Sequence, residues 1–187
     1  MNIVIVKYNS GNIQSVRNAL ERLGHFATVT DDPDLIRTAD KVIIPGVGEA
    51  GAAMNYLMER DLDTVLKSLE QPVLGICLGM QLLCKSSEES DTTCMAVFNT
   101  CVKKIQGALK VPHTGWNTVT NPDNGKSWYA YFVHSYYAEC CTDTSAVTTY
   151  GISFSSAMQK NNFYGVQFHP EKSGQAGADY FKKFLAI

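Results

Sequence analysis

The sequence predicts an α/β domain spanning residues 1–187, with a central, mostly parallel sheet, helices on both faces and an additional antiparallel strand region in the C-terminal half. In the first half, short continuous apolar runs alternate with helical patterns, as in parallel sheets whose strands are buried on both faces. In the second half, Val, Thr, Tyr and Phe concentrate in short runs between turn-forming residues. A chain of 187 residues suits one hydrophobic core, so we expect one domain.

The first half of the chain has the pattern of strands that alternate with helices. The runs at 3–6 (IVIV) and 41–44 (KVII) have the length of strands. Gly24 suits a helix C-terminus, and Asp32 followed by Pro33 suits the start of another helix. In chain order we expect a strand at 3–6, a helix at 13–23, a strand at 25–30, a helix after Asp32, a strand at 41–44, helical structure at 50–70 with a break near Asp61, and a strand at 72–76.

The second half changes in texture from about residue 95. Its β-branched and aromatic residues gather in runs separated by Gly, Asn, Asp and Ser, which indicates strands joined by short turns. The expected strands are 101–105, 127–133, 146–154 and 162–168. A final amphipathic helix is expected at 175–186.

Composition narrows the class of protein. A hydrophobic fraction of 45% and a charged fraction of 18% are those of a globular chain rather than a disordered one. A formal net charge of -2 gives no electrostatic reason to expect nucleic acid or an anionic membrane as a partner. No apolar run approaches the roughly 20 residues of a membrane helix, and the N-terminus lacks the pattern of a signal peptide, so we expect a cytoplasmic protein.

The cysteines form neither a metal-binding pattern nor a disulfide framework. They include no CxxC pair and no histidine at metal-ligand spacing, so we expect no metal and no cofactor. Their positions are 77, 84, 94, 101, 140 and 141. Cys84 follows Cys77 on the same expected helix and is interpreted as a core residue.

The strongest functional signal is GICLG at 75–79, where the fourth strand meets a helix. It has the pattern of a nucleophile elbow, with Cys77 in place of serine. Flanking glycines tolerate a sharp turn, the helix N-terminus favours a thiolate, and the backbone N–H of Leu78 is expected to face a developing oxyanion. The alternative is a buried cysteine in a glycine-rich turn. The motif predicts a cysteine nucleophile.

A base and its orienting group are predicted from HPE at 169–171, directly after the run FYGVQF. Pro170 disfavours a helical conformation for His169, and side chains two apart on an extended segment point to the same face. We therefore expect Glu171 to hydrogen-bond the ring of His169, which would act as the base for Cys77. The alternative is a His-Pro turn at the surface.

The other histidines are weaker candidates for a base. His25 stands alone at the start of a strand and is interpreted as structural. His113 and His134 have no carboxylate two positions away. His134 lies in YFVHSYY, so it is expected either to line the pocket or to belong to a half-buried aromatic strand.

The segment GVGEAG at 46–51 matches a dinucleotide-binding fingerprint, but in the wrong context. It follows the third strand instead of the first, and the next strand ends in Cys77 where an acidic ribose-binding residue would be needed. We interpret its glycines as a loop that approaches a ligand beside the nucleophile and supplies the second oxyanion donor.

Taken together, these motifs resemble those of the class I glutamine amidotransferases. The family pattern is carried by PGVG at 45–48, GICLGMQ at 75–81 and HPEKS at 169–173. A narrower resemblance, to the glutaminase subunits of imidazole glycerol phosphate synthases, runs nearly end to end and is carried by YNSGN at 8–12, PGVG at 45–48, VPHTGWN at 111–117 and YFVHSYY at 131–137. The resemblance implies a flavodoxin-like fold and the hydrolysis of glutamine to glutamate and ammonia through a thioester.

The resemblance also implies roles for single residues. The implied roles are: catalytic, Cys77, His169 and Glu171; oxyanion hole, Val47, Gly48 and Leu78; substrate binding, Gly46, Gln81, His134, Ser135 and Tyr136; and partner interface, Asn12 and Lys172. The implied partner is a TIM-barrel cyclase in a heterodimer, which uses the ammonia to form imidazole glycerol phosphate and AICAR in histidine biosynthesis. In the family, the PGVG peptide reorients in response to a ligand on the cyclase.

One segment departs from the family pattern. Where the family commonly reads DYGMGN, this chain has Lys7-Tyr8-Asn9-Ser10-Gly11-Asn12, which leaves the detail of docking near the partner open. Three alternatives also stay open: the glutaminase subunit of pyridoxal phosphate synthase, a non-catalytic scaffold on the same fold, and a thiol hydrolase or protease of similar topology. The first of these is expected to carry a GGES-type loop where this chain has PGVGE at 45–49.

Overall fold

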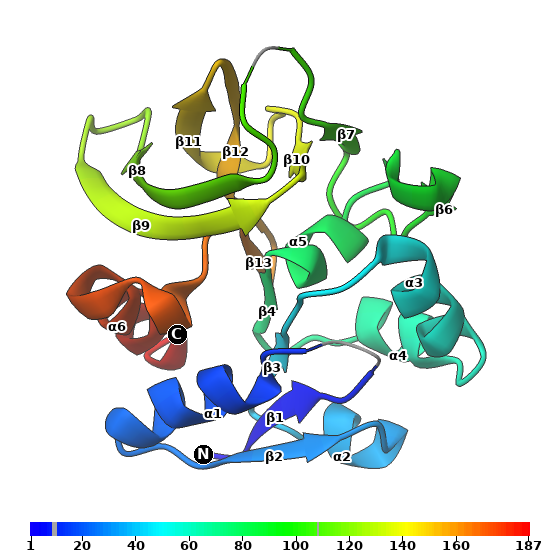
Figure 1. Cartoon of the computed structure of the whole chain (residues 1–187). Helices are drawn as coiled ribbons and strands as arrows, with labels where there is room; N and C mark the ends of the chain where they lie inside the picture. The colour runs from blue at the N-terminus through cyan, green and yellow to red at the C-terminus, as the bar shows by residue number, and fades with distance from the viewer. Residues whose placement is uncertain (9–10, 108) are drawn as a thin grey trace.

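A computed structural model describes residues 1–8, 11–107 and 109–187. A nine-stranded sheet runs through the middle of the molecule, with helices on either side of its N-terminal half (Figure 1). The helices are α1 (Ile13–Arg22), α2 (Pro33–Arg37), α3 (Ala50–Met58), α4 (Leu62–Lys67), α5 (Leu78–Leu82) and α6 (Gly174–Leu185), with 3-10 turns η1 (Glu89–Asp91) and η2 (Pro170–Lys172). In the described part of the chain, every helix is too short or too polar to cross a membrane.

The main sheet joins a parallel half to an antiparallel half. Strands β2, β1, β3, β4 and β13 are parallel neighbours, in the 2-1-3-4-5 order of flavodoxin-like folds, and β12, β11, β8 and β9 continue the sheet as antiparallel neighbours. These strands are β1 (Ile3–Val6), β2 (Ala27–Thr30), β3 (Lys41–Ile44), β4 (Val73–Ile76), β8 (His113–Thr120), β9 (Ser127–His134), β11 (Thr144–Tyr150), β12 (Ile152–Lys160) and β13 (Phe163–Val166).

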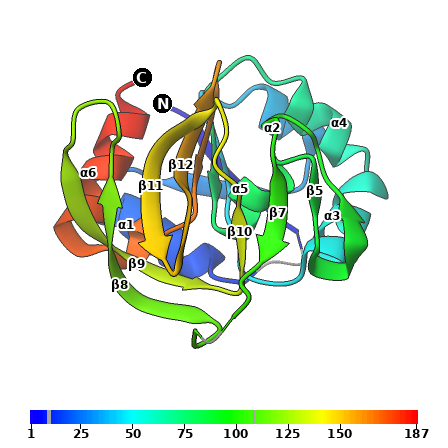
Figure 2. The ribbon, with the colours of Figure 1, turned by 90° about the horizontal axis from the view of Figure 1, so that it is seen from above.

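A second, four-stranded sheet lies beside the main one, near α3 (Figure 2). Its order is β10-β7-β5-β6, and its strands are β5 (Ser86–Ser87), β6 (Thr92–Thr93), β7 (Cys101–Lys104) and β10 (Tyr136–Ala138). Strand β10 follows β9 almost directly, so the chain passes from the main sheet to the second sheet near Ser135.

Each face of the parallel half buries its own core, which explains the continuous apolar strands. In β1, Ile3 and Ile5 pack on one side with α1 and α6, whereas Val4 and Val6 pack on the other side with α2 to α5. Alternate side chains of a strand point to opposite faces, so a strand covered on both sides must be apolar throughout. All of β1, β3 and β4 is buried.

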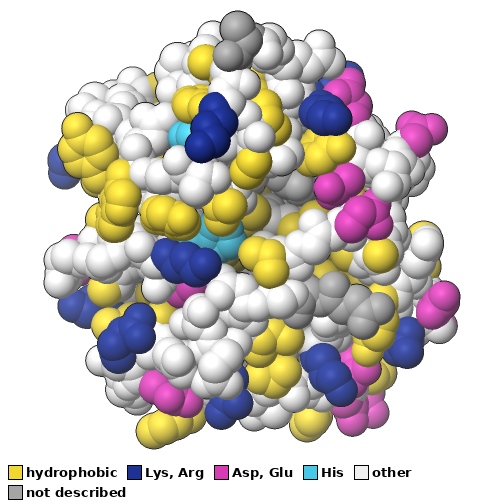
Figure 3. All heavy atoms as spheres, viewed as in Figure 1, with side chains coloured by type: hydrophobic (Ala, Val, Ile, Leu, Met, Phe, Trp, Pro, Cys, Tyr) yellow, Lys and Arg dark blue, Asp and Glu magenta, His cyan; other side chains and the backbone are white. Residues whose placement is uncertain are grey.

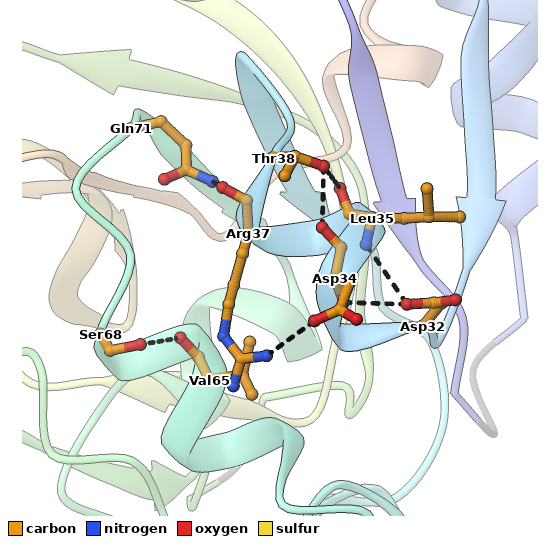
Figure 4. Close-up of polar contacts among 8 residues, drawn as sticks. All are labelled: Asp32, Asp34, Leu35, Arg37, Thr38, Val65, Ser68 and Gln71. Atoms are coloured by element: carbon orange, nitrogen blue, oxygen red, sulfur yellow. Dashed lines mark hydrogen bonds and ion pairs between the residues drawn. The ribbon is translucent and has the colours of Figure 1, made fainter.

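The predicted start of α2 is confirmed, and its chemistry is visible in Figure 4. The Asp32 side chain accepts hydrogen bonds from the backbone N–H groups of Asp34 (2.8 Å) and Leu35 (3.3 Å). At the other end of the helix, Gln71 donates to the Arg37 carbonyl at 3.3 Å. Side-chain capping of this kind satisfies backbone groups that a short helix leaves without partners.

The structure agrees with most predicted elements, and the differences lie in the C-terminal half of the main sheet and in the short strands β5 and β6, which were not predicted. Asp61 interrupts the helical segment as expected, with a φ of 55° between α3 and α4. The single strand predicted at 146–154 is wrong: the chain turns at Gly151, whose φ is 68°, and forms the hairpin of β11 and β12. Strand β8 was not predicted, because Gly115 and the largely exposed Trp116 interrupt the alternation of apolar and polar residues that is typical of a strand.

Gly79 tests the packing that fixes the elbow between β4 and α5. A Cβ at this position would lie 2.0 Å from the Ile44 carbonyl oxygen of β3, which cannot move without disturbing the sheet. We expect Gly79→Ala to lower the free energy of unfolding by at least about 2 kcal/mol. The control is Gly24→Ala, which has a φ of 83° and nothing within 4 Å of its Cβ, and should cost about 1 kcal/mol of backbone strain. Denaturant titration compares them, and equal losses would contradict this account.

Candidate active site

Cys77 lies at the tight turn between β4 and α5 that the elbow motif predicts. Its backbone adopts φ 51° and ψ -107°, a strained conformation that lifts the side chain away from the sheet. The Cys77 N–H donates to the Val166 carbonyl at 2.7 Å, which ties the turn to strand β13. The side chain is 6% exposed and lies at the N-terminus of α5. This placement suits a thiolate, although α5 is short.

His169 and Glu171 form a buried hydrogen-bonded pair. The His169 Nδ1 atom lies 2.7 Å from Glu171 Oε1, and the same oxygen accepts a short hydrogen bond from the Asn12 side-chain amide. Since a carboxylate only accepts, His169 carries its proton on Nδ1 and turns Nε2 to the opposite side. The predicted pairing is confirmed, but its geometry differs. His169 is extended before Pro170, as expected, whereas Glu171 lies in the 3-10 turn η2.

The charge state of His169 depends on its neighbours. Burial opposes a positive charge on the ring, but the Cys77 sulfur and the Glu171 carboxylate outweigh it and raise the pKa of His169 to about 10. Nε2 is buried and has no hydrogen-bond partner within the described residues. The arrangement favours an imidazolium beside the Cys77 side chain, and a positive charge beside a cysteine is typical of an activated nucleophile.

A chain of side-chain amides reaches the other side of the sulfur. Gln81 Nε2 donates to the Tyr136 carbonyl and to Gln167 Oε1, both at 2.9 Å. Gln167 Nε2 then donates to Cys77 Sγ at 3.5 Å. Sequence reasoning singled out Gln81 and the 134–136 segment but missed Gln167. A signal was present, because Gln167 is a polar residue in an apolar run and precedes His169 by two positions, hence on the same side of an extended chain.

His134 is held by a second histidine. Its Nδ1 lies 2.8 Å from the Tyr136 carbonyl, so Nδ1 is the donor, and its Nε2 accepts from His113 Nδ1 at 2.9 Å. The remaining nitrogen of His113 accepts from Asn117 at 3.3 Å. Burial lowers the pKa of His134 to about 3 and that of His113 to about 4, so both rings are neutral at pH 7. The pair fixes the segment that leads from β9 to β10.

The PGVG loop packs against the start of α5. A Cβ at Gly46 would lie 2.6 Å from both the Gly79 nitrogen and the Leu78 Cβ, so only glycine allows this approach. The Val47 carbonyl accepts from the Gly11 N–H at 3.1 Å, and the Tyr8 hydroxyl donates a short hydrogen bond to the Pro45 carbonyl. Gly46, at the start of the expected oxyanion loop, therefore adjoins the turn that carries Cys77.

The loop is anchored on its C-terminal side by two carboxylates. Glu49 caps α3 by accepting from the N–H groups of Gly51 (2.9 Å) and Ala52 (2.6 Å), and Glu89 accepts from the Ala50 N–H at 2.9 Å. Negative charge at a helix N-terminus is favourable, so the end of the loop is well fixed. Exposed Gly48 has a φ of 143°, in the region of backbone conformation that favours glycine.

The remaining predicted residues divide into two groups. Ser135 lies at the crossing between the sheets, and its carbonyl accepts from the Ile105 N–H at 2.9 Å. Of the expected interface residues, Lys172 is exposed, whereas half-buried Asn12 contacts Glu171. Asn9 and Ser10 of the unusual first loop lie outside the described residues.

On the face in Figure 3, histidine atoms show near the centre among hydrophobic side chains, with Lys and Arg side chains around them.

Comparison with known proteins places this geometry in a family context. Residues 4–187 match the family model for glutamine amidotransferase class-I. The protein named imidazole glycerol phosphate synthase subunit HisH from Bacteroides thetaiotaomicron is 49% identical over 100% of both chains, and the one from Idiomarina loihiensis is 47% identical over 100% of this chain and 98% of its own.

Solved structures share the fold at low sequence identity. A crystal structure of a glutamine amidotransferase has a TM-score of 0.78 at 17% identity and covers 98% of this chain and 99% of its own. PurLQS from Thermotoga maritima has a TM-score of 0.76 at 15% identity and covers 99% of this chain and 97% of its own. The likeness supports the α/β architecture described above.

The neutral histidine pair should make the fold sensitive to acid. The folded-state pKa values of His113 and His134 lie below the usual value of 6.5, so their contribution is complete above pH 6.5 and is lost as the pH falls towards 4. We expect the free energy of unfolding to fall from pH 7 to pH 5, by at most about 1.4 kcal/mol per pH unit for each histidine.

Denaturant unfolding at several pH values measures this slope. His113→Phe keeps an aromatic ring between Phe132 and Tyr150 but removes a titrating group, so its slope should be shallower than that of wild type. His25→Phe, in a half-buried residue outside this network, is the matched control. An unchanged slope in His113→Phe would show that the pair does not carry the acid sensitivity.

Proposed function

The chain belongs to the class I glutamine amidotransferases, and on that premise we propose that it hydrolyses glutamine to glutamate and ammonia as the glutaminase subunit of imidazole glycerol phosphate synthase. The observation that carries the proposal is the site itself: a cysteine on a strained strand-to-helix turn, beside a buried histidine that a carboxylate orients. Relatives near half identity over their full length carry the corresponding name.

The first step forms a carbon–sulfur bond. Cys77 gives its proton to His169 Nε2, and the thiolate attacks the side-chain amide carbon of glutamine. The raised pKa of His169, about 10, favours the protonated ring that this transfer produces. Glu171 keeps Nδ1 protonated and the ring in place, so Nε2 stays directed at the reacting atoms.

The second requirement is a site for the negative oxygen. Attack moves an electron pair onto the amide oxygen, which needs donors that are already in place. The Leu78 N–H at the start of α5 is one donor, and the Val47–Gly48 segment supplies the other. Gly46 packs tightly against Leu78, which supports the proposal that the two donors lie close together beside Cys77.

The intermediate then collapses and is hydrolysed. The carbon–nitrogen bond breaks, His169 donates its proton to the leaving nitrogen, and ammonia departs from a thioester on Cys77. Water next attacks the thioester while His169 accepts a proton. The carbon–sulfur bond breaks, glutamate is released, and the Cys77 sulfur takes the proton from His169, which restores the free cysteine. The sum is glutamine plus water giving glutamate plus ammonia.

Glutamine is held by residues around the sulfur. We assign Gly46, Gln81 and the segment His134–Ser135–Tyr136 to substrate binding. Both protons of the Gln81 amide nitrogen are used by Tyr136 and Gln167, so its contact with glutamine is made through Oε1. The histidine pair supports this role because it fixes the carbonyl of Tyr136 relative to His134.

The ammonia passes to a partner subunit. The relatives are named as subunits of imidazole glycerol phosphate synthase, which implies a second subunit. We assign that role to a TIM-barrel cyclase that forms imidazole glycerol phosphate and AICAR in histidine biosynthesis, in a cytoplasmic heterodimer. Asn12 and Lys172 are assigned to the interface. The contact between Asn12 and Glu171 would connect that side of the molecule directly to the catalytic carboxylate.

The nucleophile is tested with Cys77→Ala. Removing the attacking atom should lower glutamate release by at least about 1000-fold, measured with purified cyclase and its ligand present. The matched control is Cys140→Ala, which removes an exposed thiol and should retain the activity of wild type. Equal glutamate release by Cys77→Ala and wild type would exclude the thioester mechanism.

The partner is tested by comparing the isolated chain with the complex. The Val47 carbonyl already accepts a hydrogen bond from the Gly11 N–H, which holds the Val47–Gly48 peptide in its resting orientation. We therefore expect the resting loop to lack the second oxyanion donor. Addition of the cyclase and its ligand should then raise glutamate release by about 10- to 100-fold. Full activity of the isolated chain would contradict this dependence. In pull-down, recovery of a pyridoxal phosphate synthase barrel in place of the cyclase would overturn the partner assignment.

A further inference from the structure

Gln167 is a polar side chain buried in an apolar environment. Its exposure is 0%, and its neighbours Val166 and Phe168 are 0% and 1% exposed. A buried amide is costly unless its donors and acceptor are used. Methionine would fill a similar volume without that cost, so the amide indicates that a hydrogen-bonding group is needed at this point.

The sheet places Gln167 beside the nucleophile. Strands β4 and β13 are parallel neighbours in which Ile76 pairs with Val166. The Cys77 N–H continues this pairing by donating to Val166, and the Gln167 N–H is held by the Ser156 carbonyl at 3.0 Å. Backbone hydrogen bonds on both sides therefore fix where the Gln167 side chain begins.

The orientation of the Gln167 amide follows from its hydrogen-bond partners. The Tyr136 carbonyl only accepts, so the Gln81 atom that contacts it must be the nitrogen. That nitrogen also contacts Gln167, so the Gln167 atom facing it is the oxygen. The Gln167 nitrogen is left to face Cys77 Sγ, at 3.5 Å. The direction of the donor is thus fixed by a backbone carbonyl.

We propose that Gln167 is a catalytic residue, whose side-chain amide donates a hydrogen bond to the Cys77 sulfur and stabilises it as a thiolate. The proposal rests on the proposed function only in taking Cys77 as the nucleophile. A hydrogen bond to the charged form of a group favours that form. An amide cannot accept the cysteine proton at neutral pH, so Gln167 complements His169, which does.

The bond acts at two points in the reaction. It stabilises the attacking thiolate before the carbon–sulfur bond forms. It stabilises the same thiolate again when that bond breaks and sulfur leaves from the thioester. The titratable group beside the sulfur is His169, with Glu171 behind it. Gln167 adds a neutral donor to this set, so it can stabilise negative charge without changing the net charge of the site.

The experiment compares the pH dependence of Cys77 alkylation by iodoacetamide in three forms of the full chain: wild type, Gln167→Met and Gln81→Met. Mass spectrometry of the peptide containing Cys77 separates it from the other thiols. We expect the midpoint in Gln167→Met to rise by about one pH unit, the usual effect of losing a hydrogen bond to a charged group. Gln81→Met removes the contact to the Gln167 oxygen but leaves the Gln167 side chain beside the sulfur, so its midpoint should move by less than half as much.

The outcomes separate the proposal from a purely structural role. If Gln167 only serves to hold Gln81, both variants will shift the midpoint equally, and the proposal fails. An unchanged midpoint in folded Gln167→Met also overturns it. Alkylation needs no glutamine hydrolysis, so a glutaminase assay that failed would count against the proposed function and leave this measurement unaffected.

A second measurement uses the wild-type chain and covers the case in which Gln167→Met does not fold. In ¹⁵N-labelled protein, the side-chain amide signals of Gln167, assigned through its backbone, should move as Cys77 loses its proton and again when Cys77 is alkylated. The amide of exposed Gln159, on β12, is the control and should stay in place. A Gln167 amide that does not respond to the state of Cys77 would overturn the proposal.

Discussion

The parallel pairing of β4 with β13 is the constraint on which the site depends. It joins segments about ninety residues apart in the chain, with Ile76 opposite Val166 and the Cys77 N–H bound to the Val166 carbonyl at 2.7 Å. In this register, Cys77 follows the end of β4, and Gln167 and His169 follow the end of β13, so the three residues lie at the same edge of the sheet. A slip of β13 by one residue would turn Gln167 and His169 to the opposite face, away from the sulfur. The apolar strands on both cores stabilise the register, so the stability of the fold and the geometry of the site have the same origin.

Electrostatics then divides the buried histidines into two kinds. His169 has a carboxylate and a sulfur beside it, and its pKa rises to about 10 despite burial. For His134 and His113 burial is the main cause, and their pKa values fall to about 3 and about 4. One ring is suited to carry a proton, and the other two are suited to hold backbone in fixed tautomers. The distinction comes from the neighbours of each ring, because the residue type is the same.

Sequence predicted those parts of the fold and site that depend on local pattern. Buried strands at 3–6 and 41–44, the break at Asp61 and the elbow at Cys77 each follow from adjacent residues. The contacts of Gln167 were missed because its partners are distant in the chain. The hairpin at Gly151 pairs adjacent residues, and it was missed because a lone glycine is a weak turn signal within a run of strand-forming residues. The conformation at Glu171 was also not predicted, since a 3-10 turn and not an extended segment brings its carboxylate to His169.

Asn12 connects the first loop to the carboxylate of Glu171. Asn at a helix N-cap usually accepts a hydrogen bond from the first turn, yet Asn12 has a left-handed φ of 71° and makes no such cap. Its side chain donates to Glu171 instead. Helix α1 therefore begins without a stabilising contact worth about 1 kcal/mol, and the carboxylate gains a second donor. Since the loop that departs from the family pattern ends at this residue, a change in the loop can reach His169 through a single side chain.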